Sequence, residues 1–417
     1  MSVTTKSSWL FGLLTALIAS GQAGESVAVK FEGTRPECLS IGDPLRRAHR
    51  LTPSLDGITD TSTGELLSAQ AWAERLQFVQ VLFIGEEHTN DEFHRVQWQA
   101  IRALHTAGRR VHIGLEMFPW GPSAALDQWV AGELDEQTFL DESRWYEVWS
   151  HQWAHYRQIF EFARQNRLPM YGLNAPREAV REIRRVRGFE GLEPTLRAGF
   201  APSIDTQNVE HRQLVQAYFS ADDPLHRLPD AAQQEGIYLA QLAWDASMGW
   251  QAAKLAEGFA GPEDILVVLI GAGHVAYDLG AARQLADNSK VEASSLIPTA
   301  VEGICAVDSS NISAAYSKYI WGIPNTPQPS LPVSGVSLMG RIGREPTQVI
   351  HVEEGSPAAV AGVRVGDILR TLDRQSLKNG ASLQRKLGDY QWGDAAILEL
   401  ERDGRLISLT LNFRRSK

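Results

Sequence analysis

The chain has 417 residues, of which 43% are hydrophobic, and this length allows two or three domains with a sizeable core. Forty basic residues against 50 acidic ones give a net charge of −10, which argues against nucleic-acid binding. The composition is typical of a globular protein and contains no low-complexity tract.

The first 23 residues have the pattern of a signal peptide. Lys6 precedes an apolar run over residues 9–19, and small residues follow up to Ala23, where we expect cleavage. The run is well short of the roughly 20 residues that span a bilayer, and no other stretch is a candidate span. We therefore expect a periplasmic or otherwise exported protein, soluble after signal cleavage, with no transmembrane segment in the mature chain.

Cys38 and Cys305 are the only two cysteines. Because an exported protein meets an oxidising compartment, the two can form a disulfide bond. Two unpaired cysteines, with Cys305 buried as a small hydrophobic residue, are the alternative. The sequence leaves both possibilities open.

Short apolar runs alternate with amphipathic segments along most of the chain. This alternation predicts an α/β fold with a mainly parallel sheet, helices on both of its faces, and a long helical insertion. We expect strands at 81–85, 109–118, 169–174 and 264–271, a helix over about 142–166, and the helical insertion over 180–260.

Prolines crowd the segment after residue 322, which predicts a stiff, extended linker. The roughly 85 residues beyond it differ in character from the preceding part and are expected to form a small, β-rich domain. The predicted units are a signal peptide (1–23), an α/β domain (24–322), the linker (323–332) and the small domain (333–417).

Polar side chains follow each predicted strand. They are Glu86, Glu87 and His88 after the first strand, Glu116 in the second, Asn174 and Arg177 after the third, and His274 after the last. The carboxyl ends of parallel strands lie along one edge of a sheet, so these groups are expected to converge. Taken singly, a His or Glu after a strand is more often a helix cap or a surface group, but four strand ends with the same polarity favour a real site. Two imidazoles with several carboxylates suit a zinc-like or iron-like ion, or an acid/base pair without metal.

Two further sequence patterns are typical of binding sites, but the rest of the sequence favours a structural interpretation of each. Residues 271–276 fit a dinucleotide-binding glycine pattern, but too few residues follow for the remaining strand–helix units, so nucleotide binding is disfavoured. In the segment 145–156, tryptophans recur every fourth residue, and His151 and His155 have ligand spacing on a helix. An aromatic core stripe is the favoured interpretation, and a cavity for a flat hydrophobic ligand is the alternative.

The chain resembles the ChaN-like haem-binding family, part of a wider group with Tiki-type proteases, TraB proteins and erythromycin esterases. The matching segments come in the family order within residues 75–300: Gly85 to His88 with His94 and Gln97, 114–118, 174–178, 241–248 and 271–275. Unlike lipoprotein relatives, this chain lacks a lipid-attachment cysteine.

The resemblance implies an exported protein of haem or iron handling. His88, Asn174, His274 and Tyr277 are then candidate haem-binding residues, and Tyr238 and Met248 are possible ligands in principle.

The wider group implies a hydrolytic, often metal-dependent site. His88, Glu116 and His274 would be metal ligands or acid/base groups, Glu86 or Glu87 would activate a water, and Arg177 would stabilise an oxyanion.

Residues 352–369 resemble the most recognisable segment of bacterial PDZ domains. Such a domain binds a peptide by strand addition and captures its terminal carboxylate with loop amides. We expect the groove helix at 380–388 and the loop at Val333, Ser334, Gly335 and Val336, although Ser334 replaces the usual apolar residue. A PDZ fold that binds nothing is the alternative.

Three functions follow from these patterns. The favoured one is an exported haem- or iron-binding protein whose PDZ domain recruits a C-terminal or extended peptide of a partner. The second is a metal-dependent hydrolase or peptidase. The third is a scaffold without catalytic activity, in which only the PDZ domain acts.

Overall fold

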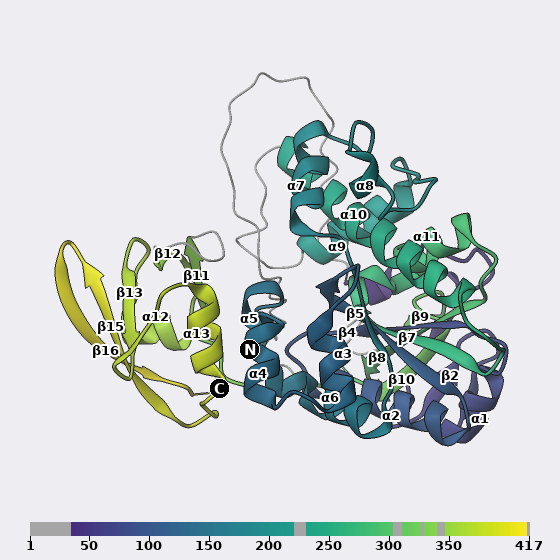
Figure 1. Ribbon diagram of the computed structural model, residues 1–417, viewed down its shortest axis with the longest axis horizontal. Helices are drawn as coiled ribbons and strands as arrows, with labels where there is room; N and C mark the ends of the chain where they lie inside the picture. Colours follow the sequence, from purple (N-terminus) through teal and green to yellow (C-terminus); the bar gives the residue numbers. More distant parts are fainter. Residues whose placement is uncertain (1–34, 221–230, 303–310, 327–328, 340–346, 415–417) are drawn as a thin grey trace.

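The computed structural model describes residues 35–220, 231–302, 311–326, 329–339 and 347–414. The expected signal peptide and Cys305 lie outside these residues. Cys38 is disulfide-bonded. Within the described ranges, no helix has the length and apolar character needed to cross a bilayer. A large unit of strands and helices lies beside a small, β-rich unit (Figure 1).

The large unit is built on an eight-stranded sheet with the strand order β3-β2-β10-β8-β4-β7-β5-β6. All neighbours from β10 to β6 are parallel, whereas β2 pairs antiparallel with β10 and with β3. The strands are β2 (Ile58–Asp60), β3 (Glu65–Leu67), β4 (Val81–Glu86), β5 (Arg110–Pro119), β6 (Met170–Asn174), β7 (Asp264–Gly271), β8 (Ala293–Ala300) and β10 (Tyr319–Ile323). The expected mainly parallel sheet is confirmed. A separate pair of short strands joins β1 (Arg50–Leu51) to β9 (Ile312–Ser313).

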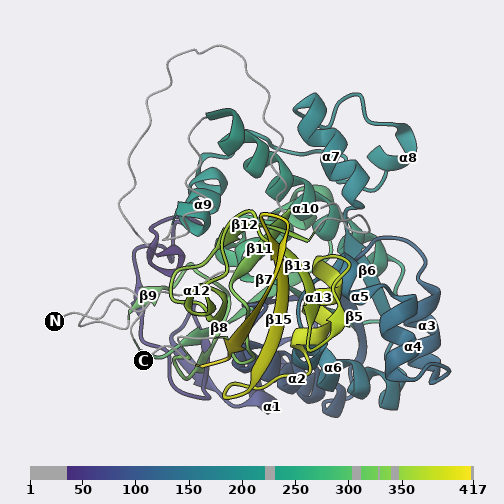
Figure 2. The same ribbon diagram turned by 90° about the vertical axis from the view of Figure 1, so that its left-hand side faces the viewer.

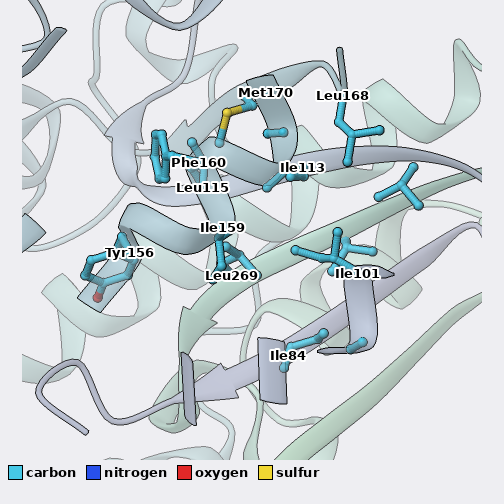
Figure 3. Packing of buried hydrophobic residues seen from close by; sticks show 14 of the residues in the cluster. Ile84, Ile101, Ile113, Leu115, Tyr156, Ile159, Phe160, Leu168, Met170 and Leu269 are labelled. Atoms are coloured by element: carbon cyan, nitrogen blue, oxygen red, sulfur yellow. The ribbon is translucent and has the colours of Figure 1, made fainter. Parts of the chain in front are cut away.

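The central strands of this sheet are buried on both faces. In β4, Leu82 and Ile84 belong to one core cluster, and Val81 and Phe83 belong to the other. Successive side chains of a strand point to opposite faces, so a continuous apolar strand requires cover on both sides. Helices α2 and α6 cover the first face, and α10 and α11 cover the second (Figures 1 and 2). Figure 3 shows the packing on the first face, including Ile101 of α2.

The helices of the large unit are α1 (Ala69–Arg75), α2 (Asp91–Thr106), α3 (Ala124–Ala131), α4 (Glu136–Glu142), α5 (Trp145–Val148), α6 (Trp153–Asn166), α7 (Arg177–Val186), α8 (Pro194–Arg197), α9 (Val209–Ser220), α10 (Ala231–Glu257) and α11 (Ala281–Asn288). The short 3₁₀ helices of the described residues are η1 (Pro36–Cys38), η2 (Ala272–His274) and η3 (Ala276–Asp278). Helices α7 to α10 form the expected helical insertion, although a segment between α8 and α9 is not helical.

The segment 142–166, expected to form one helix, is divided into α5 and α6, so the prediction of a continuous helix was wrong. Ser150 has a left-handed φ of 64°, which interrupts the helical hydrogen bonds. Trp145 Nε1 donates to His151 O at 2.8 Å and ties the turn to α5. His151 therefore lies in the turn, and the pair with His155 does not have helical ligand spacing.

The small unit is an antiparallel sheet with the order β11-β12-β13-β15-β16, with β14 paired to β13. Its elements are β11 (Val336–Met339), β12 (Gln348–Val352), α12 (Pro357–Ala361), β13 (Ile368–Leu372), β14 (Gln375–Ser376), α13 (Gly380–Leu387), β15 (Ala395–Arg402) and β16 (Arg405–Asn412). One apolar cluster fills it, with Leu383 and Leu387 of α13 packed on the strands. The predicted small β-rich fold is confirmed.

Candidate functional site at the carboxyl edge of the large sheet

Glu86, the last residue of β4, is a buried carboxylate that forms hydrogen bonds with three neighbouring side chains. Its Oε1 lies 2.8 Å from His88 Nδ1 and accepts from Tyr156 Oη at 2.5 Å, and its Oε2 accepts from Gln97 Nε2 at 2.6 Å. Burial raises the pKa of Glu86, but the nearby His94 and His88 outweigh it and lower the pKa to about 2. An ionised, fully engaged carboxylate is suited to orienting His88.

His88 turns its other ring nitrogen towards the end of β7. The bond to Glu86 uses Nδ1, and a Cβ built on Gly271 would lie 3.4 Å from His88 Nε2 and 3.5 Å from Glu116 Oε2. Gly271 thus leaves room for the imidazole and the carboxylate to approach each other. Burial lowers the pKa of His88, but the Glu86 bond and the charge of Glu116 outweigh it and raise the pKa.

His274 is oriented by a second buried carboxylate. Its Nδ1 lies 2.7 Å from Asp245 Oδ1 on α10, and its Nε2 lies 3.5 Å from Glu116 Oε1 without a hydrogen-bond partner. Burial lowers the pKa of His274, but Asp245 and Glu116 together raise it to about 10. The other oxygen of Asp245 lies 3.0 Å from His211 Nε2. Asp245 is thus placed between two imidazoles.

Glu116 lies between the two histidines and is fixed by the neighbouring strands. Its Oε2 accepts from the backbone N–H of Gly271 at 2.5 Å. Asn174 Nδ2 donates to the backbone oxygen of Glu116 at 2.9 Å, and Asn174 Oδ1 accepts from Ala175 N. Glu116 and the two histidines lie close together because β4 and β5 both pair in parallel with β7. The structure therefore brings His88, Glu116 and His274 together, as the sequence predicted, with Asn174 as a support.

An aromatic group borders His88 on the side of α5. The ring of Trp149 lies 4.7 Å from that of His88, and the ring of His151 lies 4.8 Å from it. Burial lowers the pKa of His151 well below its ordinary value, which keeps this imidazole neutral. A second imidazole pair, His94 and His155, stacks at 5.4 Å.

The other predicted site residues point elsewhere. Arg177 donates to Val148 O at 2.8 Å and faces α5. The hydroxyl of Tyr277 donates to Pro36 O at 2.7 Å, so it is engaged in the fold. Glu87 accepts from Asn90 Nδ2 at 3.2 Å, and burial raises its pKa to about 7.

Tyr238 and Met248, the other possible haem ligands, are almost fully buried, at 2% and 0% exposure. Sequence reasoning did not assign roles to Asp245, His211 and Tyr156. Asp245 lies in a segment that resembles the family, which is a signal that could have found it. Tyr156 is the last residue of the aromatic segment 145–156, whereas no comparable sequence signal marks His211.

A metal site is not preformed in the part of the chain that the structure describes. No group of three or more His, Cys, Asp or Glu side chains there is arranged to hold a metal ion. The donor chemistry of His88, Glu116 and the orphaned Nε2 of His274 suits zinc or iron, so their role as metal ligands stays a prediction.

The predicted peptide loop runs into β11, an edge strand of the small sheet. Ser334 is buried and its carbonyl oxygen accepts from Ala358 N at 3.0 Å. Gly335 has a φ of +75° and its carbonyl oxygen accepts from Glu353 N at 2.8 Å. Within the described residues β11 pairs with β12 alone, which leaves one edge for an added strand. Carboxylate capture by Val333 to Val336 stays a prediction.

Two family models match the chain. Residues 72–285, just over half of the chain, match the family described as haem-binding uptake, Tiki superfamily, ChaN. The chain belongs to the ChaN-like haem-binding family. Residues 334–413 match the PDZ domain. The unit built on the large sheet is hereafter the ChaN-like domain, and the unit built on the small sheet is the PDZ domain.

The following solved structures are similar to the chain at TM-scores below 0.5, so the family assignment rests on the family model that matches residues 72–285. A ChaN of Campylobacter jejuni with cofacially bound haem is 17% identical at a TM-score of 0.48, covering 63% of this chain and 95% of that one. An HtrA-type protease AlgW with a decapeptide is 21% identical at a TM-score of 0.18, covering 21% of this chain and 30% of that one. A serine endoprotease from Yersinia pestis is 22% identical at a TM-score of 0.16, covering 18% of this chain and 28% of that one. The chain thus spans less than a third of the length of these proteases. No curated protein matches the chain.

Proposed function

We propose that the ChaN-like domain binds haem beside His88, Trp149 and His151, and that the protein handles haem or iron outside the cytoplasm. The observation that carries this proposal is the group of two imidazoles and an indole at the carboxyl edge of the sheet, in a chain of the haem-binding family. Haem would supply an iron ion and a flat, apolar macrocycle. The chain would contribute imidazole nitrogens, the usual ligands of haem iron, and an aromatic wall.

The four predicted haem residues differ in how well they fit this role. His274 is completely buried, so it suits a small ion or a water better than a macrocycle. The hydroxyl of Tyr277 and the amide of Asn174 are engaged in backbone contacts. His88, together with the neutral His151, fits best.

Titration of the purified protein with haemin, followed at the Soret band, tests the proposal. We expect a saturable shift that is weakened by His88→Ala and by His151→Ala. His105→Ala is the matched control, because His105 lies in the last turn of α2 and contacts Phe162 rather than the site. A wild-type titration without a saturable shift would contradict haem binding and favour the scaffold function.

A second candidate function is hydrolysis, and one observation favours it. Two carboxylate–imidazole pairs, Glu86–His88 and Asp245–His274, lie on either side of Glu116, whose Oε1 is 3.5 Å from His274 Nε2. Such pairs are a common arrangement for moving a proton in acid/base catalysis. Because Glu86 is fully hydrogen-bonded, its contacts favour an orienting role over activation of a water.

The hydrolase proposal predicts activity on a panel of peptides and esters that Glu116→Gln abolishes. Metal analysis of the wild type against the His88→Ala/His274→Ala pair tests the ligand role separately. Equal metal content, together with no activity on the panel, would exclude this function.

The remaining parts of the chain support export and recruitment. The charged and apolar pattern of residues 1–23 supports export, and mass spectrometry of the mature protein should find its first residue at Gly24. Among the described residues β11 pairs on one side only, and this supports recruitment of a partner peptide by strand addition.

A further inference from the structure

The PDZ domain contacts the ChaN-like domain through α13, which faces α4 and α5 (Figure 1). Gln152 Nε2, from the turn between α5 and α6, donates to the backbone oxygen of Gln384 at 2.8 Å. Arg385 pairs with Asp141 at 2.5 Å, and its guanidinium lies 5.6 Å from the ring centre of Tyr146. Gln152 and Tyr146 are both nearly buried, at 7% and 8% exposure, so the contact is close.

The turn held by this contact, residues 149–152, is the one that borders the candidate site. Trp149 and His151 place their rings against His88, and Gln152 follows directly. Ser150 has a left-handed φ of 64°, a conformation that a non-glycine residue keeps only where its surroundings impose it. The bond from Gln152 to α13 is one such restraint.

A second set of contacts reaches the residues that follow His88 in the sequence. Trp392 Nε1 of the PDZ domain donates to Pro329 O at 2.9 Å. The next residue, Ser330, donates its N–H to Thr89 O at 3.0 Å and accepts from Asp91 N at 2.9 Å. The linker is thereby fixed to Thr89, which directly follows His88, and to Asp91, the first residue of α2.

We propose that docking of the PDZ domain holds the 149–152 turn against His88 and so limits access to the candidate site. The two sets of contacts fix the segments that flank His88, and both originate in the PDZ domain or its linker. Helix α13 is also the helix expected to line the peptide groove, so one element contacts both the groove and the turn. The effect on haem rests on the proposed function, whereas the effect on the turn does not.

Hydrogen–deuterium exchange of the full chain tests the proposal without any ligand. The Ala381→Glu/Arg385→Glu variant places charge in the contact while leaving Leu383 and Leu387, the core residues of α13, unchanged. We expect amides at 149–152 to exchange about fivefold faster, the factor that one net hydrogen bond is worth. Exchange in β7 should stay unchanged.

Arg405→Glu is the control for Arg385→Glu, because it makes the same charge reversal on the β15–β16 hairpin, which lies away from α5 (Figure 1). Should the double variant fail to fold, Arg385→Glu alone gives the same comparison with a smaller increase. Equal exchange at 149–152 in the wild type, the contact variant and the control would overturn the proposal. The haemin association rate should rise in parallel. Faster exchange without any haem binding would support the docking role and contradict the proposed function alone.

Discussion

Glu86→Gln is the substitution that isolates the buried charge of the candidate site. The amide keeps the shape of the side chain but removes the negative charge that His88, Gln97 and Tyr156 face. In the native protein the neighbouring imidazoles outweigh burial and lower the pKa of Glu86 from 4.5 to about 2.

This shift makes stability depend on pH in a defined window. The ionised carboxylate contributes its full stabilisation above pH 4.5 and loses it as the pH falls towards 2. At about 1.36 kcal/mol for each pKa unit, the loss amounts to about 3 kcal/mol. Other carboxylates titrate in the same range, so the difference between the wild type and Glu86→Gln isolates this group.

Urea unfolding at several pH values between 7 and 3, followed by tryptophan fluorescence, measures the difference. We expect the free energy of unfolding of the wild type to fall more steeply below pH 4.5 than that of the variant. Parallel pH profiles for the two proteins would refute the view that Glu86 is held ionised by its histidine neighbours.

Three further substitutions test other contacts of the candidate site and of the PDZ domain. In Asp245→Asn, the pKa of His274 should fall from about 10, because burial would no longer be offset by that charge, and NMR titration of the imidazole would record it. Tyr156→Phe removes the 2.5 Å hydrogen bond to a buried carboxylate and should cost about 1.5–3 kcal/mol in urea unfolding. Gly335→Ala should destabilise the PDZ domain by about 1–3 kcal/mol, because the φ of Gly335 is +75° and the new Cβ would lie 2.1 Å from Ser356 Cβ. Exchange of β15 amides, with β7 as the reference, would locate that last effect.

The topology of a parallel sheet brings four of the site residues close together, so their proximity was predictable: Glu86, His88, Glu116 and His274. Apolar runs that each end in a polar residue predict parallel strands, and parallel strands place their carboxyl ends at one edge. The order of the strands was not needed for this inference.

The helical part of the site was not predictable in the same way. Asp245 reaches His274 only because of how α10 is rotated and placed across the sheet, which depends on packing rather than on local pattern. Ser150 lies in a sequence that favours a continuous helix, and tertiary contacts of Trp149 and Gln152 impose the turn there. Tyr277 carries a suitable functional group, but its left-handed backbone and its bond to Pro36 direct the hydroxyl into the fold.

Electron paramagnetic resonance of the ferric haem complex reports the ligands of the iron and so tests whether His88 and His151 bind haem. We expect an imidazole-ligated signal in the wild type that is lost in the His88→Ala/His151→Ala variant and retained in His105→Ala. An identical signal in all three proteins would place the haem elsewhere and refute haem binding beside His88.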